Sequence, residues 1–240
     1  MALVTGGTRG IGAAVTRVLV EAGARVFSVY RDDEAAAGAL LDVVGAGERL
    51  TALRSDITVV ADLDALFERV DSDAGGLDIL INVAGQASDG LLLRVGPDKV
   101  RAALAVNLEA TVSCCRLALV PMLKAGHGRI VNISSVVAAM GNSGQSVYAA
   151  AKAGVEGFTR SLAREVGAKG VTVNCVAPGL IDTAMTNGME PELRRRAIDA
   201  TALGREGTPA EVAGAVAYLV SDAAAYVTGA VLQVNGGMYM

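Results

Sequence analysis

Short apolar runs rich in valine, isoleucine and leucine alternate along the chain with longer segments in which apolar residues recur every three or four positions. The short runs have the length of buried strands, and the longer segments have the period of amphipathic helices. Strands are expected near residues 2–5, 25–30, 49–54, 78–83, 128–134, 171–177 and 230–234. Helices are expected near residues 10–22, 33–44, 59–72, 97–124, 146–168 and 209–220. Right-handed crossovers place such helices on both faces of a parallel sheet, so the pattern predicts an α/β fold with one seven-stranded sheet.

A glycine-rich stretch, "TGGTRGIG", leaves the first expected strand and enters the first helix. Gly6, Gly10 and Gly12 would allow a tight turn, the close approach of a pyrophosphate and close packing of the helix on the sheet. The start of the helix adds free amides and the positive end of its dipole. Such loops often only turn the chain, but this position between strand and helix favours nucleotide binding.

The end of the second strand suggests which dinucleotide is bound. A site for NAD normally has a carboxylate there, and this chain has Tyr30 and Arg31 instead. Arg9 in the glycine loop would face the same corner, and two guanidinium groups suit a 2′-phosphate, which favours NADP over NAD. Alternatively, both arginines are surface charges, and Asp32 and Asp33 hold a ribose or offset the positive charge.

The next two strand ends carry further candidates. Asp56 could accept a hydrogen bond from an adenine amino group, or it could share the N-cap of the following helix with Thr58. "NVAG", residues 82–85, ends the fourth strand with small residues that let the backbone approach a ribose or a planar ring.

Tyr148 and Lys152 lie four residues apart, and so one turn apart, on the helix near residues 146–168. An isolated pair of this kind is usually a tyrosine at the rim of the core with a snorkelling lysine. Ser135 is expected at the end of the fifth strand, where it could bind a ligand or cap a loop. Asn107 interrupts an apolar helical run, and if buried it needs partners such as a bound water.

Together these residues suggest hydride transfer between NADP and a carbonyl or alcohol. Hydride addition to a carbonyl builds negative charge on its oxygen, which requires a proton donor and a hydrogen-bond donor nearby. Tyr148 would exchange the proton, Ser135 would orient the carbonyl, and Lys152 would lower the pKa of the phenol and hold the nicotinamide ribose.

The pieces "TGGTRGIG", "NVAG", Asn107, Ser135, "YAAAK" and "APGLIDT", in this order, resemble the short-chain dehydrogenase/reductase family over essentially the whole chain. The resemblance implies a three-layer, doubly wound Rossmann-type fold in a single domain, residues 1–240, with a substrate lid near residues 183–205. It also implies that Asn107 holds a water linking Lys152 to solvent. The catalytic residues would be Ser135, Tyr148, Lys152 and Asn107. The cofactor-binding residues would be Gly6, Thr8, Arg9, Gly10, Ile11, Gly12, Arg31, Asp56, Ile57, Asn82, Ala84, Gly85, Tyr148, Lys152, Pro178, Gly179, Ile181 and Thr183.

Within the family, "GNSGQSVYAAAKAG", "VAPGLIDTAMT" and "VTGAVLQVNGGM" look most like 3-oxoacyl-[acyl-carrier-protein] reductases. That likeness implies reduction of a 3-oxoacyl thioester to the (R)-3-hydroxyacyl form with NADPH, in fatty acid biosynthesis. Acetoacetyl-CoA, quinones, steroids and polyketides are alternative carbonyl substrates. A Rossmann protein that binds NADP without turnover is a further alternative, but it would not need all four catalytic residues.

The same likeness implies an acyl carrier protein as partner and a homotetramer. Lys169 matches a basic residue that docks the acidic carrier near the site entrance, whereas Ala125 and Gly126 stand where another basic residue is usual. The three arginines of "LRRRA", residues 193–197, are either a solvated helix face or a further carrier contact. Leu91, Leu92 and Leu93 would line an acyl pocket or pack in the core.

Composition excludes several other classes. The net charge of −4 gives no general attraction to nucleic acid or to an anionic membrane, and the uncharged run 130–151 contains too many polar residues to span one. The three cysteines have no zinc-site spacing, so we expect no metal but buried thiols in a cytoplasmic protein. His127 is the sole histidine, and its place between two glycines indicates a turn rather than a hydrolase triad.

Overall fold

A computed structural model describes residues 1–45 and 47–240, and a seven-stranded parallel sheet forms its centre. The strands are β1 (Ala2–Thr5), β2 (Val26–Tyr30), β3 (Leu50–Arg54), β4 (Ile79–Asn82), β5 (Gly128–Ile133), β6 (Val171–Pro178) and β7 (Val231–Val234). They lie in the order β3-β2-β1-β4-β5-β6-β7. All seven expected strands are present, and the predicted doubly wound Rossmann-type α/β fold is confirmed.

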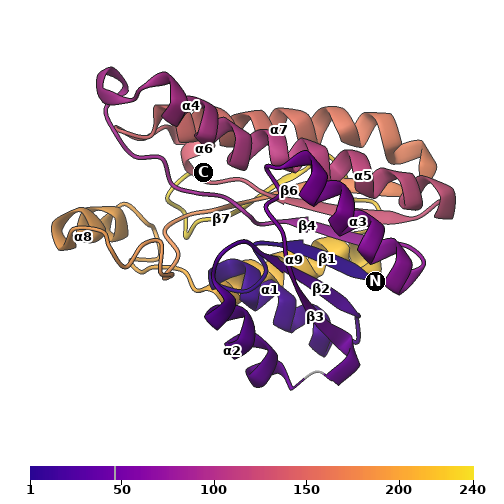
Figure 1. Cartoon of the computed structure of the whole chain (residues 1–240). Coiled ribbons are helices and arrows are strands. Elements are labelled where there is room, and N and C mark those ends of the chain that lie inside the picture. The colour runs from indigo at the N-terminus through magenta and orange to yellow at the C-terminus, as the bar shows by residue number, and fades with distance from the viewer. Residues whose placement is uncertain (46) are drawn as a thin grey trace.

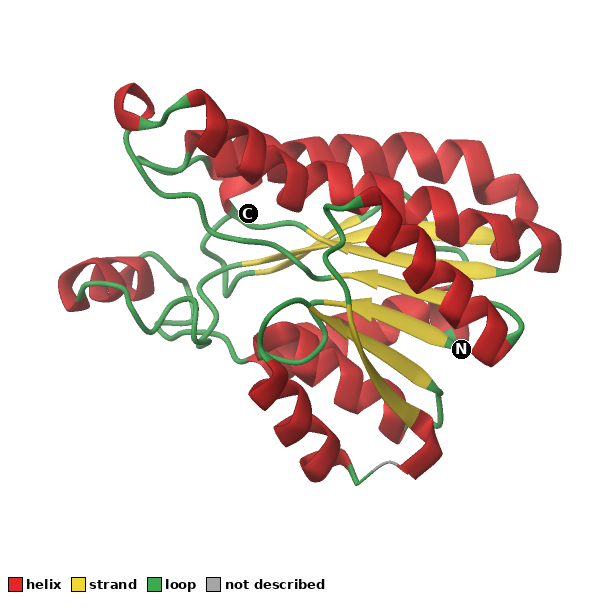
Figure 2. Ribbon diagram, viewed as in Figure 1, coloured by secondary structure: helices red, strands yellow, loops and turns green. Residues whose placement is uncertain are grey.

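Helices cover both faces of the sheet. They are α1 (Gly10–Glu21), α2 (Glu34–Val44), α3 (Val60–Ala74), α4 (Pro97–Leu104), α5 (Ala110–Ala125), α6 (Val137–Met140), α7 (Ser146–Val166), α8 (Pro191–Asp199) and α9 (Pro209–Val220). Helices α1, α2 and α9 lie on one face, and α3, α5 and α7 lie on the other (Figure 1). Figure 2 shows the sheet in yellow between these two layers, with α8 projecting from the body of the fold.

Alternate residues of each central strand supply the two cores. Val4 and Ile81 pack toward α1 and α9, while their neighbours Leu3 and Leu80 pack toward α3 and α5. All four side chains are fully buried. Burial on both faces explains why these strands read as continuous apolar runs rather than as an alternation of apolar and polar residues.

The helix expected at 97–124 has a π-helical segment, Ala105–Glu109, between α4 and α5. Asn107 lies in this segment, fully buried, and its Nδ2 donates to the carbonyl of Ala103 at 2.9 Å. A single π turn of this kind is rare and is frequently found at functional sites.

Taken as one helix, Pro97–Ala125 is long and apolar enough to cross a membrane by length and composition alone. In the fold, apolar side chains of this helix pack in the core. Cys114, Cys115, Ala118 and Met122 of α5 pack against the sheet in one of its two cores. Core helices pass the same test of length and hydropathy, so this helix is weak evidence for a membrane span.

The three cysteines are buried and free, as the sequence predicts. Burial raises the pKa of Cys114 and of Cys175 to about 12, which keeps both thiols protonated and unreactive.

A buried polar network joins β4, β5 and α7 below the carboxyl edge of the sheet. Asn82 Nδ2 donates to Asn132 Oδ1 at 2.8 Å, and Asn132 Nδ2 donates to Thr159 Oγ1 at 2.9 Å. Asn132 and Thr159 are completely buried. The network therefore sets the position of α7 along β5 by hydrogen bonds as well as by packing.

Replacing Thr159 with valine tests this network. The isosteric change leaves Asn132 Nδ2 without its acceptor inside the core and should lower the free energy of unfolding by about 1–3 kcal/mol. Thr159→Ser keeps the hydroxyl and removes one methyl group, so it should cost less. Urea unfolding at equilibrium compares the two variants, and a serine variant as unstable as the valine variant would contradict the role given to the hydroxyl.

Candidate active site

A cleft of about 630 Å³ opens at the carboxyl edge of the sheet, where ligands of open α/β sheets bind. Its walls come from the loops after β1, β2, β3, β4, β5 and β6 and from the first turns of α7. Most of the residues predicted from the sequence line it, namely Gly6, Thr8, Arg9, Gly10, Ile11, Gly12, Arg31, Asp56, Ile57, Ala84, Gly85, Ser135, Tyr148, Lys152, Pro178, Gly179, Ile181 and Thr183.

The glycine loop is shaped so that side chains cannot be added to it. A Cβ on Gly12 would lie 2.0 Å from the carbonyl oxygen of Gly6, so helix α1 and the turn before it are in direct backbone contact. Gly6 has a φ of 62°, and a Cβ there would lie 2.9 Å from Cα of Ala84. The loop therefore presents bare backbone and the start of α1 to the cleft, as a pyrophosphate site requires.

Arg9 and Arg31 meet at the corner beyond β2, as expected, and both have carboxylate neighbours. Arg31 Nε donates to Asp32 Oδ2 at 2.5 Å, and Arg9 Nη1 lies 3.9 Å from Asp33 Oδ2. Asp33 also caps α2, because its Oδ1 accepts a hydrogen bond from the amide of Ala36. All four side chains are substantially exposed, so these pairs are loosely held and the guanidinium groups stay accessible from the cleft.

Asp56 lies at the end of β3 but does not cap α3. Its Oδ1 accepts from the amide and the hydroxyl of Thr58, at 3.0 and 2.6 Å, and the N-cap residue of α3 is Val59. The hydroxyl of Thr58 holds the pKa of Asp56 below its usual value, so the carboxylate is ionised. The capping alternative is therefore wrong, and Asp56 remains a candidate for the adenine amino group.

Tyr148, Lys152 and Ser135 come together at the inner end of the cleft. Lys152 is 4% exposed, and its Nζ donates to the carbonyl of Ile133, the last residue of β5, at 2.8 Å. The same Nζ lies 5.8 Å from the centre of the Tyr148 ring. Ser135 lies two residues beyond the end of β5, and its side chain is close enough to Tyr148 to lower the pKa of the phenol. The snorkelling alternative for Lys152 is wrong, because its ammonium points inward.

Burial sets the ionisation of both groups. It raises the pKa of Tyr148, a hydrogen bond from Ser135 lowers that pKa by a smaller amount, and the charge of Asp89 raises it further. Burial lowers the pKa of Lys152 to about 8. The prediction that Lys152 lowers the pKa of Tyr148 is therefore wrong. Among the effects of the chain's own groups on this pKa, desolvation of the phenol is the largest, and it raises the pKa.

Asn107 is tied to the loop after β4. Its Oδ1 accepts from the amide of Gln86 at 3.1 Å and its Nδ2 donates to the carbonyl of Gln86 at 2.9 Å. With the bond to Ala103, both donor hydrogens of its amide have protein acceptors. A Cβ on Gly85 would lie 2.9 Å from Asn107 Oδ1 and 3.3 Å from Lys152 Nζ. Glycine at 85 thus lets the loop pass between these two side chains.

Asn82 is the exception among the predicted cofactor residues. Its side chain is 4% exposed, points away from the cleft and belongs to the network with Asn132. It acts on the site by holding β4 and β5 together, so a contact between its side chain and the cofactor is not supported.

Two residues that the sequence analysis passed over shape the mouth of the site. Gln145 Nε2, just before α7, donates to Asp89 Oδ1 at 2.7 Å, and this bond joins the loop after β4 to the start of α7. Asp89 also acts on the pKa of Tyr148 through its charge. Nothing in the spacing of these two residues marks them, because they are 56 positions apart.

Of three peripheral predictions, two change with the structure. Leu91, Leu92 and Leu93 are at least half exposed, so they do not pack in the core. Lys169 follows the far end of α7, on the order of 30 Å from Tyr148 by the length of that helix, and is not near the entrance of its own site. His127 lies in the turn before β5, as expected.

The lowered pKa of Lys152 has a consequence for stability. Between pH 8 and the ordinary lysine value of 10.5 the unfolded chain holds a proton that the folded chain has released, so this group makes stability rise with pH there. The contribution is at most about 1.4 kcal/mol per pH unit. Urea unfolding from pH 7.5 to 10 should show this rise for the native chain and for an exposed control, Lys124→Met, but not for Lys152→Met. Parallel profiles for all three would contradict it.

The comparisons with known proteins agree with this geometry. A family model described as "Enoyl-(Acyl carrier protein) reductase" matches residues 6–239. A 3-oxoacyl-[acyl-carrier-protein] reductase of Vibrio harveyi is 45% identical over 240 residues, which is 100% of this chain and 97% of the relative. The Escherichia coli protein of the same name is 43% identical with the same coverage, and that of Chlamydia muridarum is 40% identical over 99% of this chain and 96% of its own length.

Two kinds of evidence agree. The family model matches nearly the whole chain, and full-length relatives are 40–45% identical to it. The structure has the expected sheet order, the glycine loop and the cluster of Ser135, Tyr148 and Lys152. The chain belongs to the short-chain dehydrogenase/reductase family and is similar throughout to members named 3-oxoacyl-[acyl-carrier-protein] reductase.

Proposed function

We propose that the protein reduces 3-oxoacyl-[acyl-carrier-protein] to the (R)-3-hydroxyacyl form with NADPH, as a step of fatty acid biosynthesis. The observation that carries this proposal is the meeting of Ser135, Tyr148 and a buried Lys152 at the inner end of a cleft whose other end is a glycine cradle. The full-length relatives named for this reaction support the choice of substrate.

The residues of the cleft fit a nicotinamide dinucleotide. The bare backbone at Gly6 and Gly12 suits a pyrophosphate, and Asp56 is an ionised acceptor near the end expected to hold the adenine. Arg9 and Arg31 supply the positive charge that a 2′-phosphate requires, which favours NADP. When bound, this cofactor would supply the hydride.

The chain's own residues would position the ketone and manage its proton. The Ser135 and Tyr148 side chains are neighbours that both line the cleft, so we expect both hydroxyls to reach one carbonyl oxygen. The raised pKa of Tyr148 keeps the phenol protonated at neutral pH, and this is the form that ketone reduction consumes. Lys152 lies beside the Tyr148 ring in the cleft, where it would hold the nicotinamide ribose.

The name of the matching family model raises a second reaction, the reduction of an enoyl thioester. That reaction delivers both hydride and proton to carbon, whereas ketone reduction delivers the proton to oxygen. Two neighbouring hydroxyl groups in the cleft suit an oxygen that becomes negatively charged, so we favour the 3-oxoacyl substrate.

The remaining proposals concern the setting of the reaction. We infer that the protein is a single-domain cytoplasmic enzyme. By its resemblance to the family, we also infer that it acts as a homotetramer and that residues 183–205 form a lid. An acyl carrier protein is proposed as the partner that presents the substrate. Lys169 cannot assist from within the same chain, because it lies at the opposite end of α7 from Tyr148.

Replacing Tyr148 with phenylalanine should reduce kcat with NADPH and an acetoacetyl thioester by about 10²- to 10⁴-fold, because the proton donor is lost. The dissociation constant for NADPH, measured by fluorescence titration, should stay close to the native value. Tyr226→Phe is the control, since Tyr226 is fully exposed. A crotonyl thioester in the same assay tests the enoyl alternative, and full ketone activity in the Tyr148 variant would contradict the assigned mechanism.

Replacing Arg31 with aspartate should weaken NADPH binding by about 10- to 100-fold and leave NADH binding much less affected, because one charge-assisted contact to the 2′-phosphate is lost. Arg17→Asp changes the net charge equally from the exposed side of α1 and serves as the control. If the Arg31 variant keeps the native ratio of the two dissociation constants, the 2′-phosphate assignment is wrong.

A further inference from the structure

The segment 183–205, here called the lid, leaves the sheet after β6 and returns just before α9. Its base is a short neck in which Ile181 pairs with Gly207 as an isolated parallel bridge. The amide of Asp182 donates to the carbonyl of Gly207 and the amide of Gly207 donates to the carbonyl of Leu180, both at 2.9 Å. The neck is therefore fixed by backbone bonds that do not depend on the lid itself.

Helix α8 lies in the middle of the lid and is weakly packed. None of its residues, Pro191–Asp199, is buried, and Leu193 is 52% exposed. Since burial of apolar surface is the usual force that holds a helix to a domain, α8 requires another attachment.

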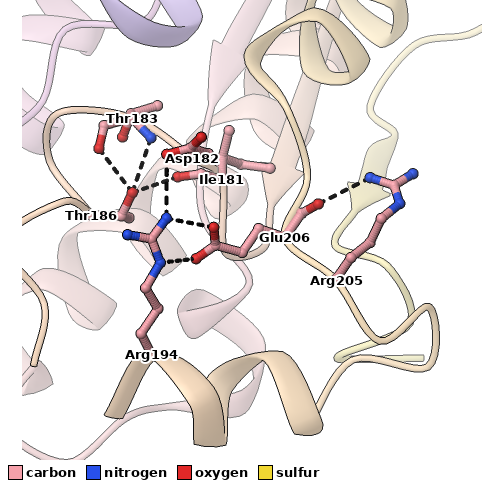
Figure 3. Close-up of polar contacts among 7 residues, drawn as sticks. All are labelled: Ile181, Asp182, Thr183, Thr186, Arg194, Arg205 and Glu206. Carbon is pink, nitrogen blue, oxygen red and sulfur yellow. Dashed lines mark hydrogen bonds and ion pairs between the residues drawn. The ribbon is translucent and has the colours of Figure 1, made fainter. Parts of the chain in front are cut away.

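Arg194 supplies that attachment. Its Nε and Nη2 donate to the two carboxylate oxygens of Glu206, each at 2.6 Å, and Nη2 also reaches Asp182 Oδ1 at 3.3 Å (Figure 3). Glu206 is 15% exposed, so the paired charges are only partly screened by solvent. Asp182 lies where the chain enters the lid and Glu206 where it leaves, so one guanidinium joins the middle of the lid to both sides of the neck.

Arg196 and Arg205 form ion pairs that do not join α8 to the neck. Arg196 pairs with Glu192 one turn earlier on α8, with both side chains about 70% exposed, so this pair stays within the helix. Arg205 at the end of the lid bonds Glu211 in the first turn of α9. Of the run at residues 194–196, Arg194 is the one whose described contacts link α8 to the neck.

The neck borders the cleft. Ile181 and Thr183 line it, and so do Met185 and Thr186 in the first turn of the lid. Thr186 Oγ1 donates to the carbonyl of Ile181 at 2.7 Å and accepts from the amide of Thr183 at 3.0 Å, which folds this turn back on the neck. The lid thus begins at the wall of the cleft and continues outward to α8.

We propose that Arg194 is a positioning residue that holds the lid against its neck in the orientation that binds the acyl substrate. The inference rests on the proposed reductase function, because it assigns the part of the lid beyond Thr186 to the acyl thioester. The neck is held by its own backbone bonds, so loss of Arg194 loosens the lid beyond it and leaves Ile181 and the glycine loop in place.

The test compares Arg194→Met with Arg196→Met, which removes the same side chain two residues away on the same helix. Arg194→Met should raise the KM for an acetoacetyl thioester about tenfold, the usual effect of losing a charge-assisted contact, while kcat and the NADPH dissociation constant stay near native values. Trypsin should cleave within the lid faster in Arg194→Met than in Arg196→Met, although each variant has lost one arginine.

Two further variants separate positioning from a general loss of structure. Glu206→Gln removes the bidentate charge pair and should move KM in the same direction. The exchange Arg194→Glu with Glu206→Arg should recover part of the native KM and resistance to trypsin, because Asp182 stands beside position 206 as well.

The proposal is overturned if Arg194→Met matches Arg196→Met in both KM and cleavage, or if the charge exchange is no better than Arg194→Met. Should Arg194→Met fail to fold, as judged by its unfolding midpoint, Glu206→Gln decides by the same measurements. The cleavage comparison needs no substrate, so it still tests the attachment of the lid if the native enzyme has no activity on 3-oxoacyl thioesters.

Discussion

The candidate site depends on a buried ammonium group. Lys152 can remain inside the protein because its Nζ donates to the carbonyl of Ile133, the last residue of β5. Burial of a cation is costly, so the bond requires α7 to sit at one position along β5. The side-chain network through Asn132 and Thr159 fixes that position two turns further along the helix. Tyr148 and Ser135 then meet as a consequence of the same alignment.

Much of this arrangement is predictable from the sequence, for physical reasons. Strands buried on both faces are apolar throughout, so the central strands could be found as short apolar runs between segments of helical period. The carboxyl ends of parallel strands share one edge, so residues that follow strands, such as Gly6, Asp56 and Ser135, gather there whatever the details of the loops. Gly12 could be recognised because contact between a helix and the backbone before it leaves room for no other residue.

The errors share a cause, which is that the sequence does not show where a side chain points. Asn82 ends β4 as expected but turns toward Asn132 rather than toward the cleft. The pKa of Tyr148 depends on how far it is buried, which spacing to Lys152 does not reveal. Lys169 matches a motif but stands at the wrong end of a helix for its own site. Asp89 and Gln145 meet only through the tertiary fold, so neither could be found by pattern.

The π-helical segment Ala105–Glu109 also changes the rotation of α4 relative to α5 about their common helix axis. An extra residue in a single turn rotates everything after it by about 100° relative to a continuous α-helix. Helix α5 can therefore keep its apolar face on the sheet while Lys99 of α4 donates to the carbonyl of Asp89 in the loop after β4. Deleting one residue from this segment would restore an ordinary helix and turn α4 away from that loop, even though the core beneath α5 stayed intact.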